Sequence, residues 1–317
     1  MNSVIKIHRE RLIFVKKICV IGSLNIDLVA SVDYLPKAGE TILGNSFGKY
    51  FGGKGANQVV QIAKLGNKVS MVGMLGDDDL GDSYKSYLEE EGVETSCIGR
   101  ANNCSSGTAI IEVDANGENR IIVIAGANGK VDKAYVDERW DSISAYDIYL
   151  LQLEIPLDTS LYLIKKLSES GKTIILDPAP ARELPCEIYK YIDFITPNET
   201  EMEVLSGISI ENERDLKIAS KTLLKMGVKN IIAKSGARGA YIINDLQFER
   251  IDGYEVETVD TVAAGDSFNA GFAYKLSKGF EVRECIRFAN AVAAISTTGR
   301  GAQEAMASID EVKAYLE

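Results

Sequence analysis

The 317-residue chain contains a single histidine, His8, close to its N-terminus. The rest of the chain therefore cannot supply a Ser-His-Asp triad, a histidine general base or the histidine ligands of most zinc hydrolases. Any proton transfer must fall to a carboxylate, Lys, Tyr or Cys.

Cysteine is scarce and scattered: the chain has five, with no Cys-x-x-Cys pair. This spacing argues against a disulfide framework or a zinc ribbon, and it is typical of a protein kept in a reducing compartment. We therefore expect a cytoplasmic protein.

Basic residues are in deficit, since 35 Lys and Arg face 46 Asp and Glu, for a net charge of −11. Nucleic acids and anionic membranes both require basic patches, and no apolar run is long enough to span a bilayer. We expect neither nucleic acid nor membrane as a partner. The hydrophobic fraction of 46% is that of an ordinary globular protein.

The first 16 residues are basic, and their apolar patch, Leu12 to Val15, is too short for a signal-peptide core. We predict a disordered extension over residues 1–16 and a single domain over 17–317. A further hypothesis is that translation starts near Val15. Mass spectrometry showing an intact Met1–Phe14 segment in native protein would contradict it.

Strand and helix patterns alternate through most of the chain. Apolar runs at 17–22, 68–72, 147–151, 173–176, 193–196 and 230–233 alternate with helical patterns at 56–65, 80–91, 157–170, 198–206 and 213–226. This order predicts an α/β fold, with a mainly parallel sheet covered by helices on both faces. In such sheets, ligands bind beyond the carboxyl ends of the strands.

Two regions have the alternating pattern of antiparallel strands instead: 26–33 with 40–50, and 108–113 with 120–124. The second pair is joined through Asn116-Gly117, a strong hairpin signal. We predict a small additional sheet from these segments.

The segment from Val259 to Gly271 combines a strand-like run (254–259), a turn of small residues and a helix start. Ala263, Ala264 and Gly265 would let a ligand approach the backbone, and the free N–H groups of a helix start attract anions. Asp266 fits less well, because its carboxylate would repel a phosphate. It either stabilises the helix start or takes part in catalysis; the combination favours attack of a hydroxyl on a phosphate.

The usual nucleotide-binding motifs are missing. Ser170-Gly171-Lys172-Thr173 follows a helix and precedes a strand, the reverse of the P-loop order, so Gly171 is predicted to end a helix. No G-x-G-x-x-G follows a strand, which argues against a Rossmann oxidoreductase. Any nucleotide must be bound by another scheme.

Four further segments each have a functional and a purely structural interpretation. The glycine-rich segment 51–58 suits a small polar ligand or a flexible turn, and Asn25 with Asp27 could hold vicinal hydroxyls or form a turn. Segment 196–201 could cap a helix, or it could hold Mg²⁺ and phosphate, and the sequence favours neither interpretation over the other. Segment 234–239 is a tight turn that could face a nucleotide or only reverse the chain.

Taken in order, these motifs resemble the ribokinase-like sugar kinases, the PfkB superfamily. The signatures are Gly52–Gln58 and Asp260–Phe268, supported by 177–185 and 196–201, and the likeness runs from Lys17 to the C-terminal helix. The wider family often has Gly where Ala263 stands. The resemblance implies a three-layer α/β/α fold with a mainly parallel central sheet and a small antiparallel β-sheet lid, at about 24–52 and 106–126. It also implies a homodimer through the lid.

The resemblance further implies the chemistry and the site. We expect transfer of the ATP γ-phosphate to O5 of D-ribose, with ATP, Mg²⁺ and K⁺ as cofactors. Asp266 would be the base, and the N–H groups of Ala264, Gly265 and Asp266 an anion hole. The implied sugar-binding residues are Asn25, Asp27, Gly53, Lys54, Asn57, Glu154 and Asp266. The implied ATP and Mg²⁺ residues are Asn198, Glu201, Lys234, Ser235, Gly236, Ala237, Arg238, Gly239, Gly265 and Asn290. The implied K⁺ residues are Asp260, Val262, Ser296, Gly299, Gly301 and Ala305.

Two positions depart from the family pattern. Ala305 replaces a Ser whose oxygen belongs to the cation loop, which puts one K⁺ ligand in doubt, and Asn290 replaces a His often found beside the adenine. The alternatives are the same chemistry on a nucleoside, fructose, deoxyribose or a keto-deoxy sugar acid, or a sugar sensor without catalysis.

Overall fold

The computed structural model describes residues 15–317. The extension predicted to be disordered covers residues 1–16, and all of it except Val15 and Lys16 lies outside the described residues, as does the segment that a start near Val15 would remove. Where the description begins, the backbone N–H of Lys16 donates to Ser277 O at 2.8 Å.

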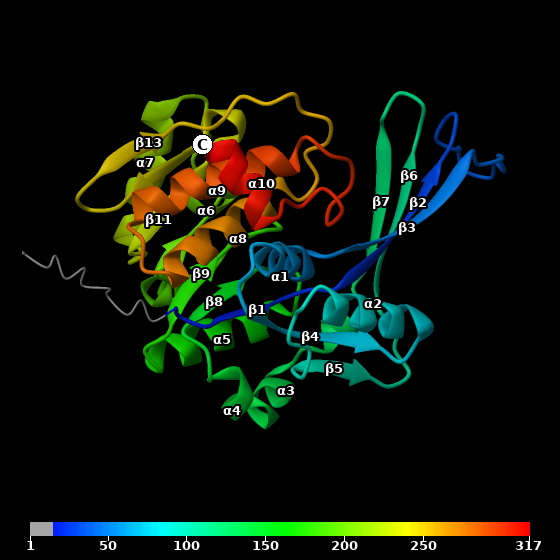
Figure 1. Ribbon diagram of the computed structural model, residues 1–317, viewed down its shortest axis with the longest axis horizontal. Coiled ribbons are helices and arrows are strands. Elements are labelled where there is room, and N and C mark those ends of the chain that lie inside the picture. The colour runs from blue at the N-terminus through cyan, green and yellow to red at the C-terminus, as the bar shows by residue number, and fades with distance from the viewer. Residues whose placement is uncertain (1–14) are drawn as a thin grey trace, which may run out of the picture.

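The described strands form two sheets (Figure 1). The larger has nine strands in the order β13-β12-β11-β10-β9-β8-β1-β4-β5, parallel except at β12 and β13. Its strands are β1 Ile18–Ile21, β4 Val69–Gly76, β5 Ile98–Ala101, β8 Ile148–Leu151, β9 Thr173–Leu176, β10 Phe194–Ile195, β11 Asn230–Lys234, β12 Ala240–Ile243 and β13 Phe248–Ile251. The predicted mainly parallel sheet is confirmed.

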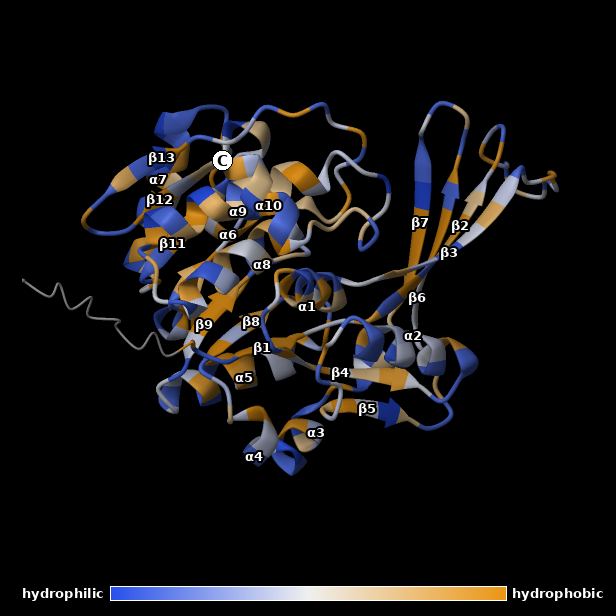
Figure 2. Cartoon of the chain, in the orientation of Figure 1, coloured by the Kyte–Doolittle hydropathy of each residue, from blue (hydrophilic) through white to orange (hydrophobic). Residues whose placement is uncertain are grey.

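Helices cover both faces of this sheet, because the strand residues point alternately to the two sides. Cys19 and Ile21 of β1 pack in one core with α3 to α7, whereas Ile18 and Val20 pack in another with α1, α2, α8 and α9. The helices are α1 Lys54–Lys64, α2 Asp79–Glu90, α3 Lys133–Glu138, α4 Trp140–Ile143, α5 Leu157–Glu169, α6 Glu199–Ser206, α7 Glu213–Lys225, α8 Ala264–Ser277, α9 Val282–Ser296 and α10 Ile309–Leu316. Short 3-10 helices are η1 Gly126–Lys130, η2 Cys186–Tyr191 and η3 Gly236–Arg238. Figure 2 shows the apolar central strands between helices of mixed polarity.

The second sheet projects from the body as a lid (Figure 1). It has the order β3-β2-β6-β7, from β2 Asn25–Ser31, β3 Ser46–Gly52, β6 Gly107–Val113 and β7 Asn119–Ile124. Gly117 in the β6–β7 turn has φ +83°, which explains why the Asn-Gly signal was informative. The additional sheet is confirmed, although β2 is antiparallel only to β3 and pairs in parallel with β6.

The predicted strand at 254–259 is wrong. The backbone N–H groups of Val259 and Asp260 both donate to Thr297 O, at 2.8 and 3.2 Å, so this end of the segment is tied to the end of α9 and not to a neighbouring strand. The predicted strand at 40–50 begins only at Ser46, because Glu40 accepts hydrogen bonds from Lys37 N and Tyr34 Oη and holds a loop. Five elements, β5, β13, α3, α4 and α9, were not predicted from the sequence.

No helix among residues 15–317 is both long and apolar enough to cross a membrane.

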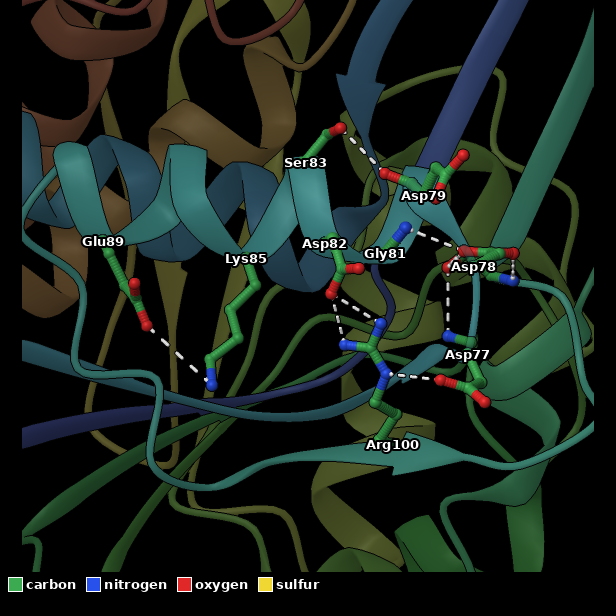
Figure 3. Close-up of polar contacts among 11 residues, drawn as sticks. Asp77, Asp78, Asp79, Gly81, Asp82, Ser83, Lys85, Glu89 and Arg100 are labelled. Atoms are coloured by element: carbon green, nitrogen blue, oxygen red, sulfur yellow. Dashed lines mark hydrogen bonds and ion pairs between the residues drawn. The ribbon is translucent and has the colours of Figure 1, made fainter.

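Asp78 ties the start of α2 to the base of lid strand β6. Its carboxylate accepts a hydrogen bond from Gly81 N at 2.8 Å, as the side chain of a helix N-cap does. It also accepts hydrogen bonds from Ser106 N and Ser106 Oγ, each at 2.7 Å. Figure 3 shows Asp78 beside Arg100, which bridges Asp77 and Asp82. Burial raises the pKa of Asp78, but the bonds from Ser106 and Gly81 and the charge of Arg100 outweigh it and hold the pKa below 3.8.

We predict that Asp78→Asn lowers the free energy of unfolding by about 1–3 kcal/mol, because the charge of the acceptor is lost and an amide has one accepting oxygen where the carboxylate uses two. Urea unfolding measures the change, and Asp79→Asn, at an exposed neighbouring position, is the control, expected within about 0.5 kcal/mol of the parent. Since the pKa is lowered on folding, the difference between parent and Asp78→Asn should be full above pH 3.8 and shrink as the pH falls through the folded-state pKa. Equal losses from both variants would contradict the assignment.

Candidate functional site

Asp266 lies in the first turn of α8 and is 4% exposed. Two side-chain amides of α1 hold its carboxylate: Asn57 Nδ2 donates to Oδ2 at 3.0 Å and Gln58 Nε2 to Oδ1 at 3.1 Å. Burial raises its pKa and so does the charge of Asp177, while Lys54, Asn57 and Gln58 oppose the rise. The carboxylate is therefore fixed in orientation and more basic than in water.

The turn before α1 brings the glycine-rich segment against the end of β1. Gly53, the N-cap of α1, has φ +90°, and a Cβ there would lie 2.7 Å from Asn25 N. Two residues on, a Cβ at Gly55 would lie 2.8 Å from Gly22 Cα. Glycine is required because the two backbones touch directly.

Lys54 and Glu154 lie on the same side of the site as Asp266. Glu154 accepts a hydrogen bond from Ser23 Oγ and another from Lys54 N at 3.2 Å. The charge of Asp266 raises the pKa of Lys54 most, with smaller contributions from Asp177, Glu154 and Glu201, against the effect of burial. The ammonium group therefore stays charged beside Asp266.

Asn25 and Asp27 extend this polar surface onto the lid strand β2. Asn25 Oδ1 accepts from Asn128 Nδ2 at 2.7 Å, which fixes its amide. Burial, together with the charges of Glu154 and Glu304, raises the pKa of Asp27 to about 6. Carboxylates and oriented amides are the groups that bind sugar hydroxyls.

The start of α8 is open to an anion. Its N-cap, Ala263, has a left-handed backbone (φ +59°) and offers no side-chain cap. Such a conformation costs a residue with a Cβ roughly 1–2 kcal/mol, a cost that Gly would not have. Ala264 N–H donates to Thr261 O at 3.2 Å, while Gly265 and Asp266 supply the next two N–H groups of this turn.

A cavity of about 580 Å³ adjoins the start of α8. Its lining includes the predicted residues Lys234, Gly236, Ala237, Gly239, Ala264, Gly265 and Asn290, together with Tyr254, Val256, Phe268, Ala293 and Ala294. Asn290 Nδ2 donates to the carbonyl groups of Ile251 and Asp252, at 3.1 and 3.0 Å. The cavity has the size and mainly apolar character of a pocket for a planar heterocycle.

Other predicted nucleotide residues lie beside this cavity without lining it. Asn198 and Glu201 form a capping box on α6, with bonds of 2.8 Å in both directions, so the structural interpretation of this segment is confirmed. Burial raises the pKa of Glu201, and Asp177 adds to the rise, against Lys234. Ser235 and Arg238 line a separate cavity of about 300 Å³, and Arg238 pairs with Glu199.

The predicted cation loop comes together around Asp260. Its carboxylate accepts from Val262 N and Gly301 N, each at 3.0 Å, which joins two loops 41 residues apart. A Cβ at Gly299 would lie 2.9 Å from that of Ala305, so these residues adjoin. The Ser296 hydroxyl is used within α9, where it donates to Ala293 O at 2.8 Å.

Three further side chains, Gln58, Asp177 and Gln303, join the site although the sequence pattern predicted no role for them. Gln58 bridges Asp266 and Asp177, with Nε2 donating to both. Gln303 Nε2 donates to Asn57 Oδ1 at 3.0 Å and to Tyr84 Oη at 2.9 Å. The position of Asp177, directly after β9, was an available signal, because ligand sites lie beyond the carboxyl ends of parallel strands.

The arrangement can align a hydroxyl with Asp266 and an anion with the start of α8. Within residues 15–317 no three His, Cys, Asp or Glu side chains gather closely enough to hold a metal by themselves. Acid–base chemistry at a carboxylate, next to an anion cradle, is the chemistry of group transfer to an alcohol.

Comparison with known proteins agrees with this geometry. Residues 15–309 match the pfkB family carbohydrate kinases. The chain is 37% identical to the ribokinase of Haemophilus influenzae over 302 residues, covering 95% of this chain and 99% of that one. It is 36% identical to the deoxyribokinase of Salmonella typhi, covering 94% and 98%. The structure of Arabidopsis thaliana ribokinase with ribose and ATP superposes with a TM-score of 0.91 at 32% identity, covering 95% and 99%.

A family match over most of the chain, relatives of nearly equal length and the confirmed fold all agree. The chain belongs to the pfkB family of carbohydrate kinases and is a sugar kinase.

Proposed function

We propose that the protein transfers the γ-phosphate of ATP to O5 of D-ribose. The observation that carries the proposal is the position of Asp266, which faces the sugar-side residues through Asn57 and lies at the uncapped start of α8 beside the large cavity. Ribokinases from several organisms are similar over almost the whole chain.

In this mechanism, Asn25, Asp27, Lys54 and Glu154 hold the sugar, with O5 beside Asp266. The O5–H proton passes to the Asp266 carboxylate as the bond from O5 to phosphorus forms. The bond from phosphorus to the bridging oxygen of ADP breaks, and ADP leaves with that electron pair. The raised pKa of Asp266 favours late acceptance of this proton.

The nucleotide base would occupy the large cavity between the turn at Gly236–Gly239 and α9. Lys234, Ala264 and Gly265 line the end of that cavity nearest Asp266. The phosphates would then point toward the start of α8, whose N–H groups and dipole stabilise negative charge on the transferring group.

The carboxylate of Glu201 fits the Mg²⁺ that accompanies ATP, since Mg²⁺ takes one or two carboxylates and completes its shell with phosphate oxygens and water. Each Glu201 oxygen accepts one bond from Asn198 and keeps a second lone pair. When bound, Mg²⁺ would neutralise phosphate charge.

The loop around Asp260 fits a monovalent cation. Carboxylate and backbone carbonyl oxygens are hard donors, and Asp260 already fastens the two parts of the loop together. Bound K⁺ would support the loop that leads into the start of α8. Ala305 offers no side-chain oxygen there.

We infer that residues 17–317 form a single domain. We also infer that two copies of the chain form a homodimer through the lid. The lid strands expose Phe47, Ile121, Ile122 and Val123, and β7 is an edge strand. Apolar edge strands of this kind need a cover. Sedimentation analysis that finds only monomers would contradict the inference.

Deoxyribose is the second candidate substrate, because a deoxyribokinase is similar over almost the whole chain. A panel of ribose, deoxyribose, fructose, a nucleoside and a keto-deoxy sugar acid, each with ATP, decides between them by ADP release. Ribose should have the highest kcat/KM; a higher value for another acceptor would overturn the assignment.

We predict that Asp266→Asn lowers kcat for ribose by about 10²- to 10⁴-fold while ribose still binds, because the proton acceptor is lost and the shape of the side chain is kept. Coupled ADP release measures kcat, and calorimetry measures ribose binding. The exposed Asp245→Asn is the control and should be unchanged. Near-normal turnover by Asp266→Asn would refute the role of this residue as base.

We predict that Ala305→Ser lowers the K⁺ concentration needed for half-maximal activity, by about threefold or more, because a hydroxyl oxygen is added to a site of oxygen donors. Rates measured against KCl, at constant ionic strength with a tetramethylammonium salt, give this value. Identical K⁺ curves for the two proteins would count against the proposed cation loop.

A further inference from the structure

Lys234 is a buried cation with one buried carboxylate partner. Its side chain is 12% exposed, and Nζ donates to Asp177 Oδ1 at 2.9 Å, where the Asp177 side chain is 3% exposed. Glu201 Oε2 lies farther off, at 4.0 Å. An ammonium group has three N–H donors, and the described hydrogen bonds use one of them.

The ammonium group lies at the start of α8. Lys234 ends strand β11 and lines the large cavity together with Ala264 and Gly265. A Cβ placed on Gly265 would lie 3.6 Å from Lys234 Nζ. The free donors of this ammonium therefore adjoin the N–H groups of the anion cradle.

The same cation is linked to the base through two side chains. Asp177 Oδ2 accepts from Gln58 Nε2 at 3.0 Å, and that nitrogen also donates to Asp266 Oδ1 at 3.1 Å. The acceptor hydroxyl lies at Asp266 in the proposed mechanism, so the phosphate nearest to this chain of contacts is the one that is transferred.

The buried carboxylates around the site outnumber the buried cations, so Lys234 matters for the charge balance. Asp177, Glu201 and Asp266 are three buried carboxylates, and the described cations among them are Lys54 and Lys234. The charge of Asp266 raises the pKa of Lys54 more than any other group does, and Lys54 belongs to the proposed sugar-binding residues. Without Lys234, Lys54 would be the one described cation left to balance these three carboxylates when a triphosphate enters.

We propose that Lys234 Nζ contacts the transferring phosphoryl group and is a catalytic residue, and that Asp177 is the positioning residue that holds this ammonium. The inference rests on the proposed kinase function. A compact ammonium charge acts on a phosphoryl group whose negative charge shifts during a loose transfer. The pair with Asp177 keeps the ammonium in place before ATP arrives, so its orientation costs little on binding.

The test compares Lys234→Met with Lys229→Met, a lysine next to the same strand whose ion pair with Asp193 is exposed. We expect Lys234→Met to lower kcat by about 10²- to 10³-fold, the usual loss for one preorganised donor, with the ribose KM within about threefold. Lys229→Met should behave as the parent. A kcat within about threefold of the parent for Lys234→Met would overturn the proposal.

Nucleotide affinities distinguish the loss of a contact to the γ-phosphate from a general loss of structure. Calorimetry should show the non-hydrolysable analogue AMP-PNP bound at least about tenfold more weakly by Lys234→Met, while ADP changes by less than about threefold. Equal weakening of both nucleotides would place the cation elsewhere and overturn the proposal. If Lys234→Met does not fold, Lys234→Arg is the second variant, since it keeps the charge. It should keep the AMP-PNP affinity and lower kcat. Loss of its preference for AMP-PNP over ADP would overturn the proposal.

Asp177→Asn tests the positioning role. In this variant the Lys234 ammonium remains, but its ion pair with residue 177 becomes a weaker, uncharged hydrogen bond. We therefore expect kcat to fall at least about tenfold while AMP-PNP binding is retained. Parallel losses in kcat and binding would show a structural role only. If the parent and Lys229→Met phosphorylate no sugar, the proposed function fails, whereas the ratio of AMP-PNP to ADP affinity still tests Lys234.

Discussion

The hydrogen bonds that Asn57 and Gln58 donate to Asp266 are the contacts on which the site depends. A carboxylate buried to this extent is costly unless it is bonded and its charge balanced. Helix α1 supplies both amides, and the N-terminal residue of that helix, Lys54, supplies the charge. The Asp266 carboxylate is thus fixed by one helix although it belongs to another.

The same two amides extend the network in opposite directions. Through Asn57 the site reaches Gln303 and Tyr84, whose hydroxyl donates to Gly52 O at 2.6 Å, at the base of the lid. Through Gln58 it reaches Asp177 and the end of β9. The Asp266 carboxylate is therefore linked through side chains both to Gly52, at the end of lid strand β3, and to Asp177, which follows β9 of the larger sheet.

Local sequence patterns predicted the parts of this site that depend on neighbouring residues. The glycine-rich turn at Gly53 and the helix start at Asp266 are of this kind, because backbone freedom and helix ends are encoded within a few positions. The bond between Gln58 and Asp177 spans 119 positions and that between Asn25 and Asn128 spans 103, so no local pattern reports them. Side-chain direction at the end of a strand is equally hidden: Lys234, the last residue of β11, lines the large cavity, whereas the next residue, Ser235, lines the smaller one.

The direct contact between the backbones of Gly22 and Gly55 has a consequence for the entropy of binding. Each of these residues lacks side-chain torsions, so the alignment of the loop after β1 with α1 is set by the main chain and not by rotamers. Ordering a rotamer-rich side chain costs roughly 0.5–1.5 kcal/mol on association. A site whose halves meet backbone to backbone avoids that cost, and more of the contact energy with a small, weakly apolar sugar remains available as affinity.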